Sequence, residues 1–105
     1  MTTEHFSGVT LSTKANVYFN GKCISYSFTQ ADGTRKSVGV VLPATLTFST
    51  AAAEIMECVE GSCEYKLDGT DDWKTSTAGE RFHIPANSKF DIRVAEAYHY
   101  ICHYA

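Results

Sequence analysis

Apolar and polar residues alternate along much of the chain with a period of two, which is the pattern of β-strands with one buried face. In the clearest example, Phe90, Ile92 and Val94 fall on one side. Asp91 and Arg93 fall on the other side. This alternation predicts a strand whose apolar side chains enter the core and whose charged side chains point away from it.

Further β-rich runs follow one another closely and are separated by turn residues. Asp32 and Gly33 indicate a hairpin turn, because this dipeptide readily adopts the positive φ angles of a tight turn. No segment keeps a helical period over more than about three turns. The predicted strands lie at residues 22–29, 37–42, 45–50, 54–58, 62–67, 73–77, 80–84, 89–94 and 98–104, with a turn at Gly61. About nine or ten short strands at this spacing indicate an all-β sandwich or barrel.

The length of the chain is enough for one domain. A chain of 105 residues can bury a hydrophobic core without disulfides or metals. Its content of 44% hydrophobic and 20% charged residues is that of an ordinary globular protein. Residues 1–15 are polar and rich in threonine and serine, so we expect a loosely ordered N-terminal arm there. The barrel domain is predicted to occupy residues 16–105.

Charge and cysteine usage exclude several classes of protein. The net charge is −3, with scattered lysines and arginines, whereas a nucleic-acid partner requires a basic face. No apolar run approaches the roughly 20 residues of a membrane helix, and no apolar secretory segment is visible at the N-terminus. The four cysteines show no CxxC or zinc-finger spacing. We therefore expect a cytoplasmic protein with free thiols and with no membrane or nucleic-acid partner.

Two spacings in the sequence fit the frame of the cupin motifs. Glu54 and Gly61 give E-x6-G, and Gly79 and Pro85 give G-x5-P. With the strand pattern, these spacings resemble the cupin family. They predict an all-β fold of the cupin or jelly-roll β-barrel kind, in a single domain.

The positions at which cupins carry metal-binding histidines hold other residues in this chain. The two histidines of the first motif would fall at Thr47 and Ser49 or, one residue later, at Phe48 and Thr50. The histidine of the second motif would fall at Phe90. Transition metals prefer imidazole, thiolate or carboxylate ligands, and only the glutamate of the frame remains. The sequence therefore predicts no bound metal.

A closer resemblance is carried by short segments that occur in order and without large gaps. They are Tyr18-Phe-Asn-Gly-Lys22, Gly33-Thr-Arg-Lys-Ser-Val-Gly-Val40, Phe48-Ser-Thr-Ala51, Glu54-Ile-Met56, Ala78-Gly79, Ile84-Pro85 and Tyr100-Ile-Cys-His-Tyr104. Through them, about residues 16–104 resemble the small cupin-like family of pyrimidine/purine nucleoside phosphorylases.

This resemblance implies a glycosyltransferase, more narrowly a pentosyltransferase. It would convert diverse nucleosides and inorganic phosphate reversibly into a free base and α-D-ribose 1-phosphate, with phosphate as co-substrate and without a cofactor. The family tail runs Tyr-Leu-Cys-x-Tyr-Leu, whereas this chain has His103 at the variable position and Ala105 at the end. These departures leave the preferred nucleoside and the packing of the terminus open.

Phosphorolysis needs a cation for phosphate, an acceptor for the ribose hydroxyls and a donor for the leaving base. Arg35, beside Ser37, is the first candidate for phosphate, because a planar guanidinium can bind two oxygens at once. Glu54 occupies the inward position of the cupin frame and is the candidate for the ribose hydroxyls. Each of these could instead be a solvated surface charge. Arg93 is a further candidate for substrate binding, although its strand pattern points it outward or into a subunit interface.

Several aromatic residues could stack on the base, and stacking tolerates any base. The candidates are Phe48, Phe90, Tyr98 and Tyr100, and the alternative for each is a place in the barrel core. Cys102 is expected to be a buried thiol rather than a nucleophile.

Histidines are expected on the outside of the barrel. His83 is flanked by apolar neighbours that would face inward, so it should face outward. His99 and His103 are four residues apart on one predicted strand and therefore share a face. An outer face fits them better than a metal pair.

Two other functions remain open from the sequence. One is a non-catalytic, metal-free cupin that binds a small anionic metabolite, and the other is a metal-dependent cupin isomerase or dioxygenase. Because jelly rolls present a flat sheet face and the chain is rich in apolar residues, we also expect a homodimer.

Overall fold

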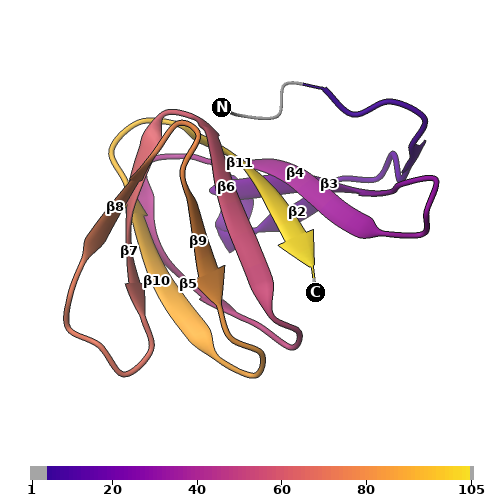
Figure 1. Ribbon diagram of the computed structural model, residues 1–105. Coiled ribbons are helices and arrows are strands. Elements are labelled where there is room, and N and C mark those ends of the chain that lie inside the picture. Colours follow the sequence, from indigo (N-terminus) through magenta and orange to yellow (C-terminus); the bar gives the residue numbers. More distant parts are fainter. Residues whose placement is uncertain (1–4, 105) are drawn as a thin grey trace.

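The computed structural model describes residues 5–104, which form two antiparallel β-sheets facing each other (Figure 1). The larger sheet has seven strands in the order β1-β3-β4-β11-β6-β9, and β2 pairs with β3 beside this path. The smaller sheet has four strands in the order β5-β10-β7-β8. This arrangement confirms the predicted all-β class.

The strands are short, as their sequence pattern predicts. The larger sheet contains β1 (Thr10–Leu11), β2 (Asn16–Tyr18), β3 (Cys23–Thr29), β4 (Arg35–Val41), β6 (Glu54–Glu60), β9 (Arg81–Ile84) and β11 (Tyr98–Tyr104). The smaller sheet contains β5 (Ala44–Ser49), β7 (Ser62–Leu67), β8 (Lys74–Thr77) and β10 (Lys89–Val94).

The core lies between the two sheets and is filled by alternate residues of the strands. On β10, Phe90, Ile92 and Val94 are buried, which confirms the face predicted from the alternation. Buried side chains from the facing sheet, such as Phe82 and Ile84 of β9, pack in the same cluster. The hydrophobic effect thus fixes which face of each strand points inward, because a shift of one residue would expose every apolar side chain.

The hairpin predicted at Asp32 and Gly33 joins β3 to β4. Gly33 has a φ of 89° and its N–H donates to the Gln30 carbonyl at 2.9 Å, so the turn closes within a few residues. The return strand therefore begins at Arg35, two residues before the predicted position. That early start places Arg35 and Ser37 at alternate positions of β4, and hence on one face of the sheet.

Part of the predicted N-terminal arm contacts the barrel. Thr10 and Leu11 of β1 pair with β3, and the Phe6 ring lies 4.8 Å from the Phe28 ring. Residues 1–4 lie outside the described part of the chain. The boundary between arm and barrel at residues 15 and 16 stays a prediction.

The sequence reasoning did not predict the segment that follows β2. It is a three-residue 3₁₀ turn, η1 (Phe19–Gly21), with φ angles of 54° at Phe19, 55° at Asn20 and 89° at Gly21. The left-handed region is costly for an L-residue with a bulky side chain, so Phe19 is under backbone strain. Within residues 5–104, no helix is long and apolar enough to cross a membrane.

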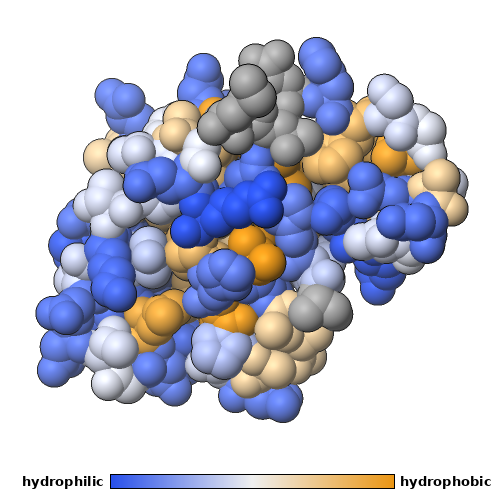
Figure 2. All heavy atoms as spheres, in the orientation of Figure 1, coloured by the Kyte–Doolittle hydropathy of each residue, from blue (hydrophilic) through white to orange (hydrophobic). Residues whose placement is uncertain are grey.

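The outer face of the larger sheet carries a chain of charged and polar side chains. Glu57 of β6 contacts Arg81 of β9 at 2.8 Å and His103 of β11 at 2.9 Å, and His103 contacts Lys36 of β4 at 2.6 Å. In the view of Figure 2, hydrophilic side chains cover most of the surface and hydrophobic ones show only in small areas between them. His83 is exposed and His99 half-buried on this same sheet.

Candidate functional site

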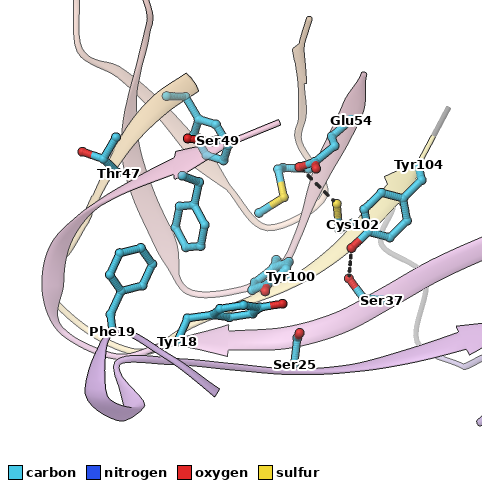
Figure 3. A pocket seen from close by; sticks show the side chains of 13 residues that line it. Tyr18, Phe19, Ser25, Ser37, Thr47, Ser49, Glu54, Tyr100, Cys102 and Tyr104 are labelled. Carbon is cyan, nitrogen blue, oxygen red and sulfur yellow. Dashed lines mark hydrogen bonds between the residues drawn. The ribbon is translucent and has the colours of Figure 1, made fainter. Parts of the chain in front are cut away.

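A cavity of about 290 Å³ opens between the two sheets and is the candidate site (Figure 3). One part of its wall is polar and comes from the larger sheet. The other part is aromatic and comes mainly from the smaller sheet and the η1 turn. Its lining residues are Tyr18, Phe19, Ser25, Ser37, Thr47, Phe48, Ser49, Glu54, Met56, Phe90, Tyr100, Cys102 and Tyr104.

The polar wall is a group of side chains from three neighbouring strands. Tyr104 pairs with Glu54 across β11 and β6, and Cys102 pairs with Ser37 across β11 and β4. Cross-strand partners point to the same side of a sheet, so all four side chains meet at the cavity. The Cys102 thiol donates to Oε1 of Glu54 at 3.5 Å, and the Ser37 and Tyr104 hydroxyls are 3.1 Å apart (Figure 3).

Burial governs the ionisation of this wall. It raises the pKa of Glu54, and the hydrogen bond from Cys102 opposes that rise in part. Burial also raises the pKa of Cys102 to about 12 and that of Tyr104 to about 12. At neutral pH the thiol and the phenol therefore keep their protons and can donate hydrogen bonds to a carboxylate or to a ligand oxygen.

The aromatic wall is a row of rings that begins at the mouth of the cavity. The Phe19 and Phe48 ring centroids are 5.2 Å apart at an interplanar angle of 79°, and Phe48 stacks on Phe90 at 5.5 Å. Phe48 and Phe90 are cross-strand partners on β5 and β10, which sets this stacking. Rings of this kind offer apolar faces to a flat ligand.

Arg35 lines a second hollow that adjoins the first. This hollow, of about 580 Å³, is lined by Asn16, Tyr18, Ser27, Arg35, Ala52 and Tyr104. Tyr18 and Tyr104 line both spaces. Because β11 lies between β4 and β6, Arg35 and Glu54 come from the strands on either side of Tyr104. Within the described part of the chain, Arg35 forms no ion pair, which leaves its guanidinium available to an anionic ligand.

The structure brings most of the candidate residues from the sequence to these two spaces. Glu54, Ser37, Phe48, Phe90 and Tyr100 line the first, and Arg35 lines the second. Cys102 is a buried thiol, as expected, and it lies in the cavity wall, where it donates to the Glu54 carboxylate.

Two candidates lie elsewhere. Tyr98 is 0% exposed and is absent from the cavity lining, so it is part of the core. Arg93 lies on the outer face of the smaller sheet, where it pairs with Glu64 at 2.9 Å and stacks over Trp73 at 3.9 Å. The residue pattern of β10 had already pointed Arg93 outward, and neither side chain can reach a ligand in the cavity.

Other lining residues had no assigned role from the sequence, above all Tyr18, Phe19 and Tyr104. Tyr18 and Phe19 lie in the segment Tyr18-Phe-Asn-Gly-Lys22, and Tyr104 lies in the tail, which are two of the segments that carry the family resemblance. Their place in these segments was the sequence feature that could have marked them as site residues. Strand alternation alone would have sent Tyr18 and Phe19 to opposite faces.

Three positions of the cupin motif frame, Phe48, Glu54 and Phe90, line the cavity, and the residues of the lining do not fit a metal. Phe48 is a residue of β5 in the cavity lining, Phe90 stands opposite it on β10, and Thr50 follows β5 and is buried outside the lining. Among the described residues of the lining, only Glu54 and Cys102 carry a carboxylate or a thiol, and none carries an imidazole. Two potential ligands are fewer than the three or four protein side chains that hold a transition metal in most sites.

Comparisons with known proteins agree with the resemblance seen in the sequence. Residues 13–104 match the model of the family described as pyrimidine/purine nucleoside phosphorylase. Proteins of that name from Ralstonia pickettii and Delftia acidovorans are 82% and 79% identical over 105 residues, covering 100% of this chain and of each relative.

Solved structures agree on the fold. A protein of unknown function from Acinetobacter has a TM-score of 0.94 at 41% identity, covering 96% of this chain and 98% of its own. An RmlC-like cupin from Shewanella frigidimarina has a TM-score of 0.68 at 16% identity, covering 88% of this chain and 82% of its own, which shows the fold alone. The predicted cupin fold is thereby confirmed.

Proposed function

The chain belongs to the pyrimidine/purine nucleoside phosphorylase family, and on that basis we propose that it catalyses the reversible phosphorolysis of nucleosides. The products are a free base and α-D-ribose 1-phosphate, which makes the enzyme a pentosyltransferase within the glycosyltransferases. The structural observation that carries the proposal is the placement of Glu54 and Arg35 on either side of Tyr104, in two adjoining spaces.

In this reaction the bond from C1′ to the base nitrogen breaks and a bond from C1′ to a phosphate oxygen forms. The base leaves with the bonding electron pair, and the proton of hydrogen phosphate ends on the base nitrogen. No further co-reactant is needed. Positive charge develops on the ribose ring in the transition state, as in other glycosyl transfers. The protein must therefore place negative groups, such as the Glu54 carboxylate and the bound phosphate, near the ring.

Arg35 is placed to bind the phosphate. Its guanidinium lies in the hollow beside the cavity and can hold two oxygens at once. Asn16 and Ser27 line the same hollow, with the Asn16 amide donating to the Ser27 hydroxyl at 3.2 Å, and they add neutral hydrogen-bonding groups. Phosphate held there lies on the Arg35 side of Tyr104.

Glu54 is placed to bind the ribose. Its carboxylate can accept the ribose hydroxyls and stabilise positive charge on the sugar. Cys102 occupies one of its oxygens with a thiol hydrogen bond, which limits the ways in which the carboxylate can turn. The Tyr104 phenol, between Glu54 and the Arg35 hollow, keeps its proton and can donate to an oxygen shared by sugar and phosphate.

The aromatic wall is placed to bind the base. Phenylalanine rings carry no hydrogen-bond donors or acceptors, so they hold a base by stacking without reading its edge. A site of this kind accepts both purines and pyrimidines, which fits the breadth stated in the family's name.

We propose further that the enzyme works without a cofactor, as a homodimer in the cytoplasm. The unpaired state of its four cysteines fits a reducing compartment. Half-buried apolar residues of the larger sheet, including Val38, Val40 and Val59, face outward and offer a surface to a second copy. Size-exclusion chromatography with light scattering tests the dimer.

The test of the activity uses purified protein with uridine or inosine, each with and without phosphate, and chromatography of the products. We expect base release only with phosphate, equimolar ribose 1-phosphate, and the same rate after treatment with EDTA. Base release that is independent of phosphate would overturn the proposal. Thermal stabilisation by phosphate without any turnover would favour the alternative, a non-catalytic metal-free cupin that binds a small anionic metabolite.

A further inference from the structure

A row of aromatic rings runs from the protein core to the mouth of the cavity and ends at Phe19. Phe82 meets Phe90 at 5.9 Å, Phe90 stacks on Phe48 at 5.5 Å, and Phe48 meets Phe19 edge to face at 5.2 Å. Exposure rises along the row from 2% at Phe90 to 41% at Phe19. The inner rings are therefore covered by their neighbours, and a base that enters from solvent meets Phe19 first.

The backbone at this point presents two consecutive aromatic side chains to one cavity. Tyr18 is 48% exposed and lines the cavity together with Phe19. Successive side chains of a strand point to opposite faces, so an extended backbone could not place both rings there. The left-handed conformations of Phe19 and Asn20 turn the chain and make this possible.

Both ends of the turn are held in place. Tyr18 pairs with Cys23 across β2 and β3, and the Lys22 N–H donates to the Phe19 carbonyl at 3.2 Å. Backbone strain of the kind found at Phe19 persists only where the surrounding structure enforces it, and it is concentrated at ligand sites. In Figure 3 the Tyr18 and Phe19 side chains lie on the side of the cavity opposite Glu54.

We infer that Phe19 determines how the enzyme selects its nucleobase, with Tyr18 covering the ribose; this inference rests on the proposed function. The base stacks on Phe19 at the exposed end of the aromatic row. Tyr18, which lines both the cavity and the Arg35 hollow, lies over the path from the base to the phosphate.

Stacking on Phe19 has a consequence for selectivity. A purine has two fused rings and covers more of an aromatic face than a pyrimidine. The loss of the Phe19 ring should therefore weaken the binding of inosine more than the binding of uridine. Hydroxyl groups near the base do not separate the two base sizes: the Thr47 hydroxyl donates to Asp91 at 2.7 Å, and the Ser49 hydroxyl can donate to or accept from a purine or a pyrimidine. Selectivity between base sizes therefore depends on this ring.

The test compares wild type with Phe19→Leu, which keeps an apolar side chain without the ring, and with Phe19→Tyr, which restores the ring. We expect Phe19→Leu to raise KM about 10-fold for uridine and more for inosine, since the loss of a stacking partner typically weakens binding by about one order of magnitude. The KM for phosphate and the kcat should change little. Phe19→Tyr should return the KM values for uridine and inosine to those of wild type.

Trp73→Leu is the matched control, because Trp73 is a half-buried ring just before β8 that lies against Arg93 and outside the cavity lining. It should leave all constants unchanged. A folded Phe19→Leu protein, checked by circular dichroism, with unchanged KM for both nucleosides would overturn the inference. Calorimetric titration of uridine and inosine into both proteins gives the same comparison without turnover, so an inactive wild type would count against the proposed function alone.

Discussion

Glu57 lies 2.9 Å from Nε2 of His103 on the outer face of the larger sheet, directly behind the polar wall of the cavity. The Lys36 ammonium, 2.6 Å from Nδ1 of the same ring, can only donate a hydrogen bond. Nδ1 must therefore accept, and Nε2 carries the hydrogen that is donated to Glu57. His103 is thus a neutral imidazole of defined tautomer, held by β4 on one side and by β6 on the other.

This arrangement predicts that stability falls on acidification. Burial lowers the pKa of His103, with the Lys36 and Arg81 charges adding to the effect and Glu57 opposing it. A folded-state pKa below the ordinary value of about 6.5 means that the unfolded chain binds the proton more readily. The stabilising contribution is therefore present above pH 6.5 and is lost as the pH falls through the lowered pKa. Urea denaturation between pH 5 and 8 gives the free energy of unfolding of wild type and of His103→Gln. This free energy should fall less steeply on acidification in the variant, and the same pH dependence in both proteins would contradict the assignment.

Removal of the Glu57 carboxylate should be the most destabilising change on this face. Glu57 is only 1% exposed, and its partners include Arg81 and His103. Glu57→Ala leaves the buried N–H of His103 without its acceptor and the half-exposed Arg81 without this partner, at a cost of about 2 kcal/mol. Thermal melts should therefore show a loss of roughly 10 °C or more. Glu60→Ala is the control, because Glu60 is exposed and contacts His99 at the surface, and it should change stability by less than about 0.5 kcal/mol.

Glu54→Gln should stabilise the protein at neutral pH while it lowers activity strongly. Burial raises the pKa of Glu54, so the folded state favours the protonated form. The contribution of Glu54 to stability is then favourable below its unfolded pKa of about 4.5 and is lost as the pH rises through the raised value. An uncharged glutamine removes this cost at pH 7. Thermal melts at pH 7 should rise, whereas kcat/KM for uridine should fall by about 100-fold or more; a variant that retains activity would remove Glu54 from the catalytic role.

Arg35→Ala should act on phosphate rather than on the nucleoside. The loss of charged hydrogen bonds to phosphate should raise its KM by about 10- to 100-fold, with a small effect on the KM for uridine. Arg35→Lys should restore only part of the affinity, because an ammonium does not bind two oxygens in a planar fork. Steady-state kinetics with phosphate varied at saturating uridine measure both effects. Arg93→Ala, on the far face of the smaller sheet, should leave both constants unchanged.

Much of the fold follows from local features of the sequence. Alternation placed Phe90 and Ile92 inside, and the same pattern pointed Arg93 away from the core, because the period of a strand is two whatever the tertiary context. The tight turn at Gly33 needed only a residue that tolerates positive φ. The cupin spacing of Glu54 likewise marked an inward-facing position that the structure places in the cavity wall.

The composition of the site was decided by the tertiary structure. Glu54, Tyr104 and Arg35 lie on three strands that are brought together by cross-strand register, and register is a property of pairs of segments far apart in the chain. The left-handed turn at Phe19 could not be read from local propensity either, since propensity disfavours it and only the paired strands around it hold it in place. The residue alternation along each strand therefore determined the barrel, whereas the pairing between strands decided that a carboxylate, an arginine and an exposed aromatic turn share one site.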